Sequence, residues 1–430
     1  MKKIKFKFFL VIVIFLFYFL TFAGKVWFDH DDFDFLFFSS QFSPNELLRP
    51  HNEHFLPVFR LLFFLEYSLF KLNAQFYFAV SILLHIVSIL LIYKIVFYIT
   101  KKDFWAYSGA ILYSINATFY ESIIWITSQQ TLLCGLFLLA SYLTYLYFRI
   151  QKKAYQLYLS CFFSVLSAFS FGIGLIAPAF FFAMSLFDKK STSKARFLYF
   201  LSSLISFIAF FIFSVSKYPN LNHIFSLKVF AKMAVFFVTG FTQGLLNRFF
   251  WAGFTPSRVA DSDLLLMPIL TIAVFFIIFK ITWSGRKKKK DWFLDISLAL
   301  LTLLPYAVIA LSRFPGGFKG AMAERYTYLP LAFFIIFLVY ELQLICKSTQ
   351  LRFLVIFFIC WIIITQTIYL RIKAFTWLKQ PEQSKIYMSY LQGQIIKGLV
   401  NQNCTIPLYI NTRPDPCLRY AKILSVQKID

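Results

Sequence analysis

The sequence predicts an all-α polytopic membrane protein with about 11 transmembrane helices and additional interfacial helices. Of its 430 residues, 60% are hydrophobic and only 14% are charged, a composition that an ordinary soluble core does not have. Apolar runs of roughly 20 residues, the length that crosses a bilayer, recur along the chain. The 43 Lys and Arg residues, which contribute to a net charge of +24, fall in short clusters between these runs. Such clusters mark cytoplasmic loops, so the charge reflects membrane orientation and no nucleic-acid partner is predicted.

The basic clusters determine the predicted topology, because two consecutive cytoplasmic loops must be joined by an even number of crossings. These clusters lie at 2–7, 101–102, 149–153, 189–196, 286–290 and 347–352. The spans that satisfy this parity are 8–23, 76–99, 104–119, 131–148, two short or tilted helices within 155–187, 197–216, 264–283, 292–311, 328–345 and 353–370. Gly172 and Gly174 are the predicted turn of the hairpin within 155–187. The amino end is predicted to be cytoplasmic and the carboxyl end extracytoplasmic.

Two further hydrophobic segments would break this parity if they crossed the membrane, and both carry polar residues. Arg60 and Glu66 interrupt the segment 55–72. In 227–250, the polar residues gather on one helical face at about 100° per residue; they are Lys228, Lys232, Thr239, Gln243 and Asn247. A helix with one polar face lies in the membrane interface or lines a polar cavity. Both segments are therefore predicted to be extracytoplasmic helices that lie along the membrane.

The chain divides into a membrane domain, residues 1–371, and a tail, residues 372–430. The membrane domain includes a first extracytoplasmic loop over 24–75. Its basic and then apolar amino end also fits a cleavable signal peptide, but a retained anchor is favoured. The tail is more mixed in composition and is predicted to form a small extracytoplasmic appendage. It holds Cys404 and Cys417, and an oxidising compartment would permit a disulfide between them without requiring one.

The acidic residues concentrate in the first loop. Of the 19 acidic residues in the chain, six fall between residues 25 and 54; they are Asp29, Asp31, Asp32, Asp34, Glu46 and Glu53. By parity, this loop shares one membrane face with other polar patches. The four patches on that face span 27–34, 48–57, 120–125 and 323–330. A shared extracytoplasmic site is therefore predicted.

Several kinds of site have no support in the sequence. No P-loop, GxGxxG or HExxH motif and no metal-ligand spacing occurs in it. Nucleotide chemistry is therefore not predicted, and neither is a cofactor. Glu121 and the aspartates of the first loop could share a divalent cation, but the sequence does not predict one.

Three of the polar patches resemble a known family. The adjacent acids Asp31 and Asp32, the Glu121-x-x-x-Trp125 motif and the Ala323–Pro330 motif are similar to patterns in the GT-C superfamily of membrane glycosyltransferases. The likeness is to the branch that includes protein O-mannosyltransferases and lipid A aminoarabinose transferases. It implies a GT-C-like fold in the inner cell membrane, a polyprenyl-phosphate sugar donor and an inverting transfer on the extracytoplasmic face. The chain lacks the large soluble insertion of the protein O-mannosyltransferases, so a lipid, a glycan and a protein all stay open as acceptors.

Such a transfer needs a carboxylate base at the acceptor hydroxyl and a cation at the departing phosphate. Asp31 or Asp32 is the predicted base, with Asp32 preferred, because repulsion between neighbouring carboxylates and burial both raise a carboxyl pKa. Arg325 is the predicted phosphate clamp and Arg49 its alternative, since a guanidinium binds two phosphate oxygens at once. The other residues predicted to bind substrate are Glu121, Tyr326, His51, Glu53 and His54.

Two alternative functions use a similar membrane architecture. A polysaccharide ligase or polymerase shares the lipid-linked donor but generally relies on a large loop with paired arginines and a histidine. The charged loop in this chain is early and acidic. A transporter or flippase of lipid-linked sugars places ionisable residues at mid-bilayer within broken helices and often contains internal repeats. Mid-span charges are few here and no repeat is evident, so glycosyl transfer is the preferred prediction.

Overall fold

A computed structural model describes residues 13, 16–22, 24–29, 31–52, 54–214, 226–251, 292–313, 321, 323–346 and 349–377. Within these ranges the chain forms helices and loops and has no strand, apart from an isolated antiparallel bridge between His51 and His54. The all-α class is therefore confirmed for the described residues.

Three sequence predictions fall wholly or partly outside the described residues. The predicted span at 264–283 lies outside them, as does the tail from residue 378 onward, which holds Cys404 and Cys417. Only part of the predicted first span, 8–23, is described, and residues 16–22 of it are helical.

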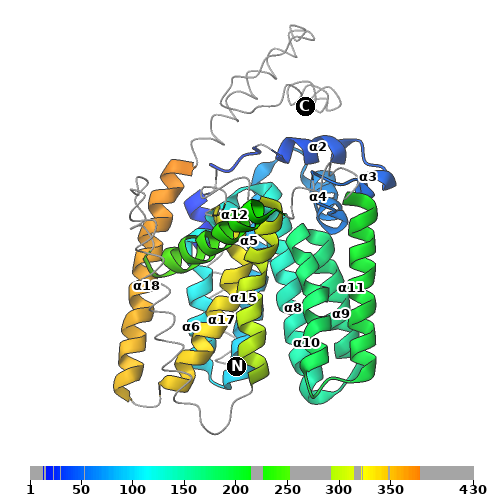
Figure 1. The fold of residues 1–430 in the computed structure, drawn as a ribbon. Coiled ribbons are helices and arrows are strands. Elements are labelled where there is room, and N and C mark those ends of the chain that lie inside the picture. Colours follow the sequence, from blue (N-terminus) through cyan, green and yellow to red (C-terminus); the bar gives the residue numbers. More distant parts are fainter. Residues whose placement is uncertain are drawn as a thin grey trace.

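Long helices form the bulk of the described structure and lie together as a bundle (Figure 1). They are α5 (Ala74–Thr100), α8 (Gln129–Gln151), α11 (Ser193–Ser214), α15 (Trp292–Arg313), α17 (Tyr328–Ile345) and α18 (Thr349–Trp377). Each coincides with a predicted span. Among the described residues, 6 segments are long and apolar enough to cross a membrane. They lie in α5, 126–151 (which includes α8), α11, 227–250, α15 and α18, and shorter apolar helices, α17 among them, accompany them. A multi-pass membrane architecture is supported in this way, while the count of about 11 spans stays a prediction.

Polar residues at the predicted span ends begin and end the long helices. Asn73 precedes α5, and its side chain accepts a hydrogen bond from the backbone N–H of Gln75, which satisfies one donor of the first turn. The helix ends at Lys101, which has the left-handed φ of 56° typical of a helix C-terminus. Lys152 ends α8 in the same conformation, with φ of 58°. The lysines that signal topology therefore also stand at the helix boundaries.

The predicted hairpin within 155–187 is confirmed. It consists of α9 (Ala154–Ser170), the 3-10 turn η3 (Gly172–Leu175) and α10 (Ile176–Phe187). Gly174, in η3, lies directly against α9, because a Cβ atom there would lie 1.9 Å from the backbone oxygen of Ser167. The glycine is required for space, since φ at this position is not in the left-handed region.

Gly174→Ala should therefore destabilise the hairpin. The obstructing atom belongs to the backbone, so α9 and η3 would have to move apart to admit a methyl group, at a cost of about 1–3 kcal/mol or more in the free energy of unfolding. Gly109→Ala is the matched control, because the atoms nearest to its Cβ would be side-chain methyl groups, the nearest of them on Val96 at 3.2 Å. Thermal unfolding of the two purified variants checks the prediction. Equal melting temperatures would contradict it.

One end of the bundle is covered by short helices. They are α2 (Asp32–Ser40), α3 (Pro44–Leu48), α4 (Pro57–Phe70), η1 (Ala117–Phe119), α7 (Tyr120–Ile124), η2 (Ile126–Ser128) and η8 (Glu324–Tyr326). In Figure 1, α2, α3 and α4 lie at the end opposite the α10–α11 connection. The helix α4 confirms the helix predicted at 55–72 and packs against α2 and α9. We call this region the α2 end of the bundle.

The segment predicted to lie along the membrane at 227–250 forms three consecutive helical pieces. These are α12 (Leu227–Thr239), the π-helix η6 (Gly240–Asn247) and α13 (Arg248–Trp251). The helix α12 runs obliquely to α15 and α18 (Figure 1), although this segment is also long and apolar enough to cross a membrane. Its interfacial position therefore stays a prediction.

The polar face predicted for this segment is divided in the structure. Lys228 and Lys232 are exposed, whereas Thr239, Gln243 and Asn247 are buried. The Asn247 amide donates a hydrogen bond to Gln243 Oε1 at 2.6 Å. Wider winding in the π-helix changes which residues share a face, so the regular helical period does not hold through it.

The end of the bundle opposite α2 contains a buried ion pair. Arg149 Nε lies 2.9 Å from Asp188 Oδ2, and both side chains are buried. The Tyr145 hydroxyl donates to the same carboxylate oxygen at 3.0 Å, and the Arg149 guanidinium lies 4.1 Å from the centre of the Phe293 ring. Arg149, from the basic cluster at 149–153, therefore joins α8, α10 and α15.

Candidate functional site

Part of the acidic first loop folds into α2, and both candidate catalytic acids lie at its amino-terminal end. Asp31 is the N-cap residue, and Asp32 and Asp34 lie in the first turn. Carboxylates are favoured there because they face the positive end of the helix dipole. Consecutive residues on a helix point about 100° apart, and here one of the adjacent acids is buried while the other is partly exposed.

Asp32 is fully buried, with 0% of its surface exposed. Its Oδ2 accepts a hydrogen bond from the backbone N–H of Asp29 at 2.8 Å. Its Oδ1 accepts hydrogen bonds from the backbone N–H of Thr127, at 2.7 Å, and from the Thr127 hydroxyl. Burial raises the pKa of Asp32 to about 7, and these hydrogen bonds oppose the rise. The residue preferred as base from the sequence therefore links the first loop to η2 and offers no surface to a substrate.

Asp32→Asn should lower stability, and the loss should be larger at low pH. The amide keeps only one acceptor oxygen, so a buried backbone N–H loses its partner, at about 1–3 kcal/mol. Because folding raises the pKa of Asp32 from 3.8 to about 7, the native state binds the proton more tightly, and this group's contribution to stability falls as pH rises between those values. Asparagine does not titrate, so the difference between wild type and variant should shrink with rising pH. Thermal unfolding at pH 5 and pH 8 checks this; a difference that grows with pH would contradict it.

Asp31 is the accessible member of the pair, with 35% of its side chain exposed. Its Oδ2 lies 3.7 Å from Nε2 of His51. Asp34, one helical turn along α2, completes a group in which one ligand atom from each of the three residues lies within 4.8 Å of the others. Two carboxylates and an imidazole at this spacing are a donor set that can hold a metal ion. These residues form what we call the Asp31 cluster.

His51 and His54 belong to one tight turn but have different surroundings. Their backbones exchange two hydrogen bonds of 2.9 Å, and Asn52 between them has a left-handed φ of 52°. Nη2 of Arg313 lies 3.3 Å from Nε2 of His54. Burial and the Arg313 charge lower the pKa of His54 to about 3, so the imidazole is neutral and accepts the arginine N–H. Glu53 lies outside the described residues.

Glu121 and Arg325 form an ion pair across the α2 end of the bundle. Arg325 Nη1 lies 2.5 Å from Glu121 Oε1, and the Arg325 backbone N–H donates to Oε2 at 3.0 Å. Burial alone would lower the pKa of Arg325, but the Glu121 charge raises it above its ordinary value. Glu121 is buried, whereas 34% of the Arg325 side chain is exposed. Part of the charged Arg325 side chain is therefore accessible from the surface.

Two of the remaining predicted residues lie beside these charges. Tyr326 is buried, and its ring centre lies 5.0 Å from Cζ of Arg325. Arg49 lies at the end of α3, where it pairs with Glu46 at 3.4 Å and covers the Phe38 ring at 4.2 Å. Arg49 is therefore part of the corner between α2 and α3 rather than of the Glu121–Arg325 pair.

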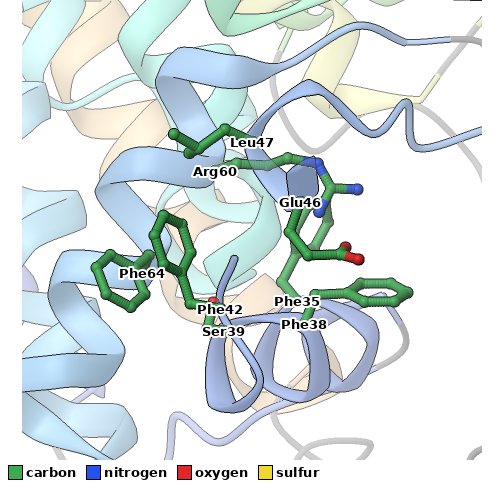
Figure 2. A pocket seen from close by; sticks show the side chains of 8 residues that line it. All are labelled: Phe35, Phe38, Ser39, Phe42, Glu46, Leu47, Arg60 and Phe64. Atoms are coloured by element: carbon green, nitrogen blue, oxygen red, sulfur yellow. The ribbon is translucent and has the colours of Figure 1, made fainter. Parts of the chain in front are cut away.

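Arg60, on α4, was missed as a site residue by sequence reasoning. Only 5% of its surface is exposed, and its guanidinium lies 5.2 Å from the centre of the Phe35 ring. Among the described residues, Nε and Nη2 of Arg60 and Oε2 of Glu46 have no hydrogen-bond partner. Figure 2 shows both side chains at one cavity with aromatic walls, which at about 10 Å³ has room for one water. Burial lowers the pKa of Arg60 to about 10, so the side chain stays charged at neutral pH.

Glu66, two turns further along α4, was also missed. Its Oε1 accepts a hydrogen bond from Gln129 Nε2 at 2.9 Å, and within the described part of the chain its Oε2 has no partner. Burial raises the pKa of Glu66 well above its usual range, and the Asp32 charge adds to the rise. A signal was available, because Arg60 and Glu66 share the helical face of Phe59 and Phe63, all of which are buried.

Three contacts join the four polar patches that the sequence places on one membrane face. The Asp31–His51 contact joins 27–34 to 48–57. The Asp32–Thr127 hydrogen bonds join 27–34 to the turn that follows 120–125. The Glu121–Arg325 pair joins 120–125 to 323–330. Segments about 300 residues apart in the sequence therefore meet at the α2 end, as a shared site requires.

No family model matches the chain, and neither a curated protein nor a solved structure matches it.

Proposed function

We propose that the protein is an integral membrane glycosyltransferase that moves a sugar from a polyprenyl-phosphate donor to an acceptor hydroxyl, with inversion at the anomeric carbon. The reaction is assigned to the α2 end of the bundle, taken as the extracytoplasmic face of the inner cell membrane. The observation that carries this proposal is that three separate polar contacts, Asp31–His51, Asp32–Thr127 and Glu121–Arg325, lie at one end of the bundle. It places an accessible carboxylate and an accessible guanidinium at the same end of an apolar bundle.

Asp31 is the base in this proposal, in place of Asp32. A base must reach the proton that it removes, and only Asp31 of the pair has exposed surface. Its carboxylate takes the proton of the acceptor hydroxyl as that oxygen attacks the anomeric carbon. The bond from the anomeric carbon to the phosphate oxygen breaks, and the electron pair leaves with the polyprenyl phosphate. Asp32 is a positioning residue, because its hydrogen bonds with Thr127 hold the start of α2 against η2.

Arg325 stabilises the departing phosphate. Negative charge develops on the phosphate as the bond breaks, and a fixed cation stabilises that charge most effectively where water is scarce. A guanidinium has five N–H donors, and the side-chain contact with Glu121 uses Nη1. Glu121 therefore orients the arginine, and its own burial makes it a positioning residue rather than a direct ligand of the sugar.

A donor screen tests the proposed function. Purified protein in lipid nanodiscs is incubated with a crude acceptor extract and with hexoses labelled on either polyprenyl phosphate or a nucleoside diphosphate. The proposal predicts transfer of label from a polyprenyl-phosphate donor only. Growth of long polymers would favour a ligase or polymerase, and movement of an intact donor across the bilayer without transfer would favour a flippase. Either result would overturn the proposal.

A further inference from the structure

His51 has an environment that neither its backbone role nor the proposed transfer reaction explains. Only 7% of its surface is exposed. Among the described residues, Nε2 has no hydrogen-bond partner. A buried ring nitrogen of this kind forgoes the hydrogen bond that it would make in water, at a cost in free energy. The Nε2 atom faces the carboxylate of Asp31 at 3.7 Å, which is too long for a hydrogen bond.

The fold holds His51 in this position. Its backbone is fixed by the two hydrogen bonds to His54, and its ring packs against Phe35, with ring centres 4.6 Å apart. Asp31, the N-cap residue of α2, and Asp34, in its first turn, approach from the same side, since residues three apart share one helical face. Two rigid elements thus bring an imidazole nitrogen and two carboxylates to one point.

We propose that Asp31, Asp34 and His51 bind a divalent transition-metal ion, through one oxygen of each carboxylate and Nε2 of the imidazole. The imidazole ligand favours Zn²⁺ over Ca²⁺ or Mg²⁺, which prefer oxygen ligands alone, and the two carboxylates also suit Mn²⁺. Ligand atoms around such an ion lie about 3–3.5 Å apart, given bond lengths near 2.1 Å. The present separations, up to 4.8 Å, close to that distance when the carboxylates rotate, and the Asp31 side chain is partly exposed and so has room to do so.

An ion in the Asp31 cluster would give the His-Asn-Glu-His turn a chemical role. It supplies the partner that His51 Nε2 otherwise lacks and offsets the repulsion between two nearby carboxylates. Three protein ligands leave at least one coordination position open, as in catalytic metal sites. A hydroxyl bound at that position loses its proton more readily than a free one. The metal site itself does not depend on the proposed glycosyl transfer, since its ligands are defined by geometry alone.

Metal content of the full-length protein tests this inference. The purified protein in lipid nanodiscs is stripped with a chelator, loaded with Mn²⁺ or Zn²⁺, desalted and analysed by mass spectrometry of the elements. We expect about one ion per chain and an affinity that falls by about 100-fold or more in Asp34→Asn and His51→Gln. Glu46→Gln is the matched control, because Glu46 lies in the same loop but outside the cluster, and it should bind like wild type. Equal binding by wild type, Asp34→Asn and His51→Gln would overturn the site.

A second measurement needs no variant. Pulsed electron paramagnetic resonance of Mn²⁺-loaded wild type should show coupling to a ¹⁴N nucleus, the signature of an imidazole ligand. Bound Mn²⁺ without that coupling would overturn the assignment of His51. The two proposals can fail separately. Ion binding without any sugar transfer would support the metal site and overturn the proposed enzyme, and sugar transfer by a wild-type protein that binds no ion would support the enzyme and overturn the metal site.

Discussion

Asp31→Asn should abolish sugar transfer while leaving the protein folded. A positioned general base contributes about 10²–10⁴-fold to rate, and asparagine removes the base while keeping its volume. Folding should survive because the Asp31 side chain makes no capping hydrogen bond to α2 and asparagine is itself a favourable N-cap residue. Transfer rates at saturating donor, together with melting temperatures, measure the two effects on the same samples.

Two variants serve as controls for this result: Glu46→Gln for activity and Asp32→Asn for stability. Glu46 lies in the same loop and outside the proposed machinery, so its variant should transfer at the wild-type rate. Asp32→Asn should lower the melting temperature, which Asp31→Asn should not. Normal turnover by Asp31→Asn in a folded protein would show that Asp31 is not the base. An equal loss of stability in the two aspartate variants would contradict the assignment of a catalytic role to Asp31 and a structural role to Asp32.

Arg325→Lys should weaken donor binding more than it weakens folding. Lysine keeps the positive charge near Glu121, which would otherwise be buried without its partner at about 3–5 kcal/mol. It loses the planar fork that binds a phosphate through two oxygens. We expect the apparent KM for the polyprenyl-phosphate sugar to rise about tenfold, which corresponds to about 1.4 kcal/mol. Steady-state kinetics over a range of donor concentration give this value.

Arg49→Lys is the comparison for the second arginine. The Arg49 side chain is 49% exposed, and it pairs with Glu46 of the preceding helix, α3, so its replacement should leave the donor KM unchanged. A raised KM for Arg49→Lys with a normal one for Arg325→Lys would transfer the phosphate role to Arg49. An unchanged KM for both would remove both from the donor site.

Apolar periodicity and basic clusters were enough to predict most of the described helices. The α5 and α8 helices follow from long, mainly apolar runs that are followed by lysines, and the α9–α10 hairpin follows from its length and from Gly172 and Gly174. These features are local, so the sequence contains them directly. The π-helix at 240–247 was not predicted, because wider winding depends on packing against neighbouring helices rather than on local period.

The candidate site could be predicted in outline but not in its contacts. Parity predicts that its four patches lie on one membrane face, yet it cannot say that Asp32 contacts Thr127, 95 residues away. Burial of Asp32 reverses the preference between the two aspartates, because only the fold determines which side of α2 faces inward. The approach of His51 to Asp31 and Asp34 likewise depends on a turn and a helix from different parts of the loop.

Transfer of radiolabelled hexose by purified protein in lipid, compared between wild type and Asp31→Asn, tests the central claim most directly. The polyprenyl-phosphate hexose and a crude acceptor extract are the substrates, and both proteins must show the same folded state beforehand. The account predicts that label moves from donor to acceptor with wild type and does not move with Asp31→Asn. No release of sugar from any polyprenyl-phosphate donor by folded wild-type protein would contradict it.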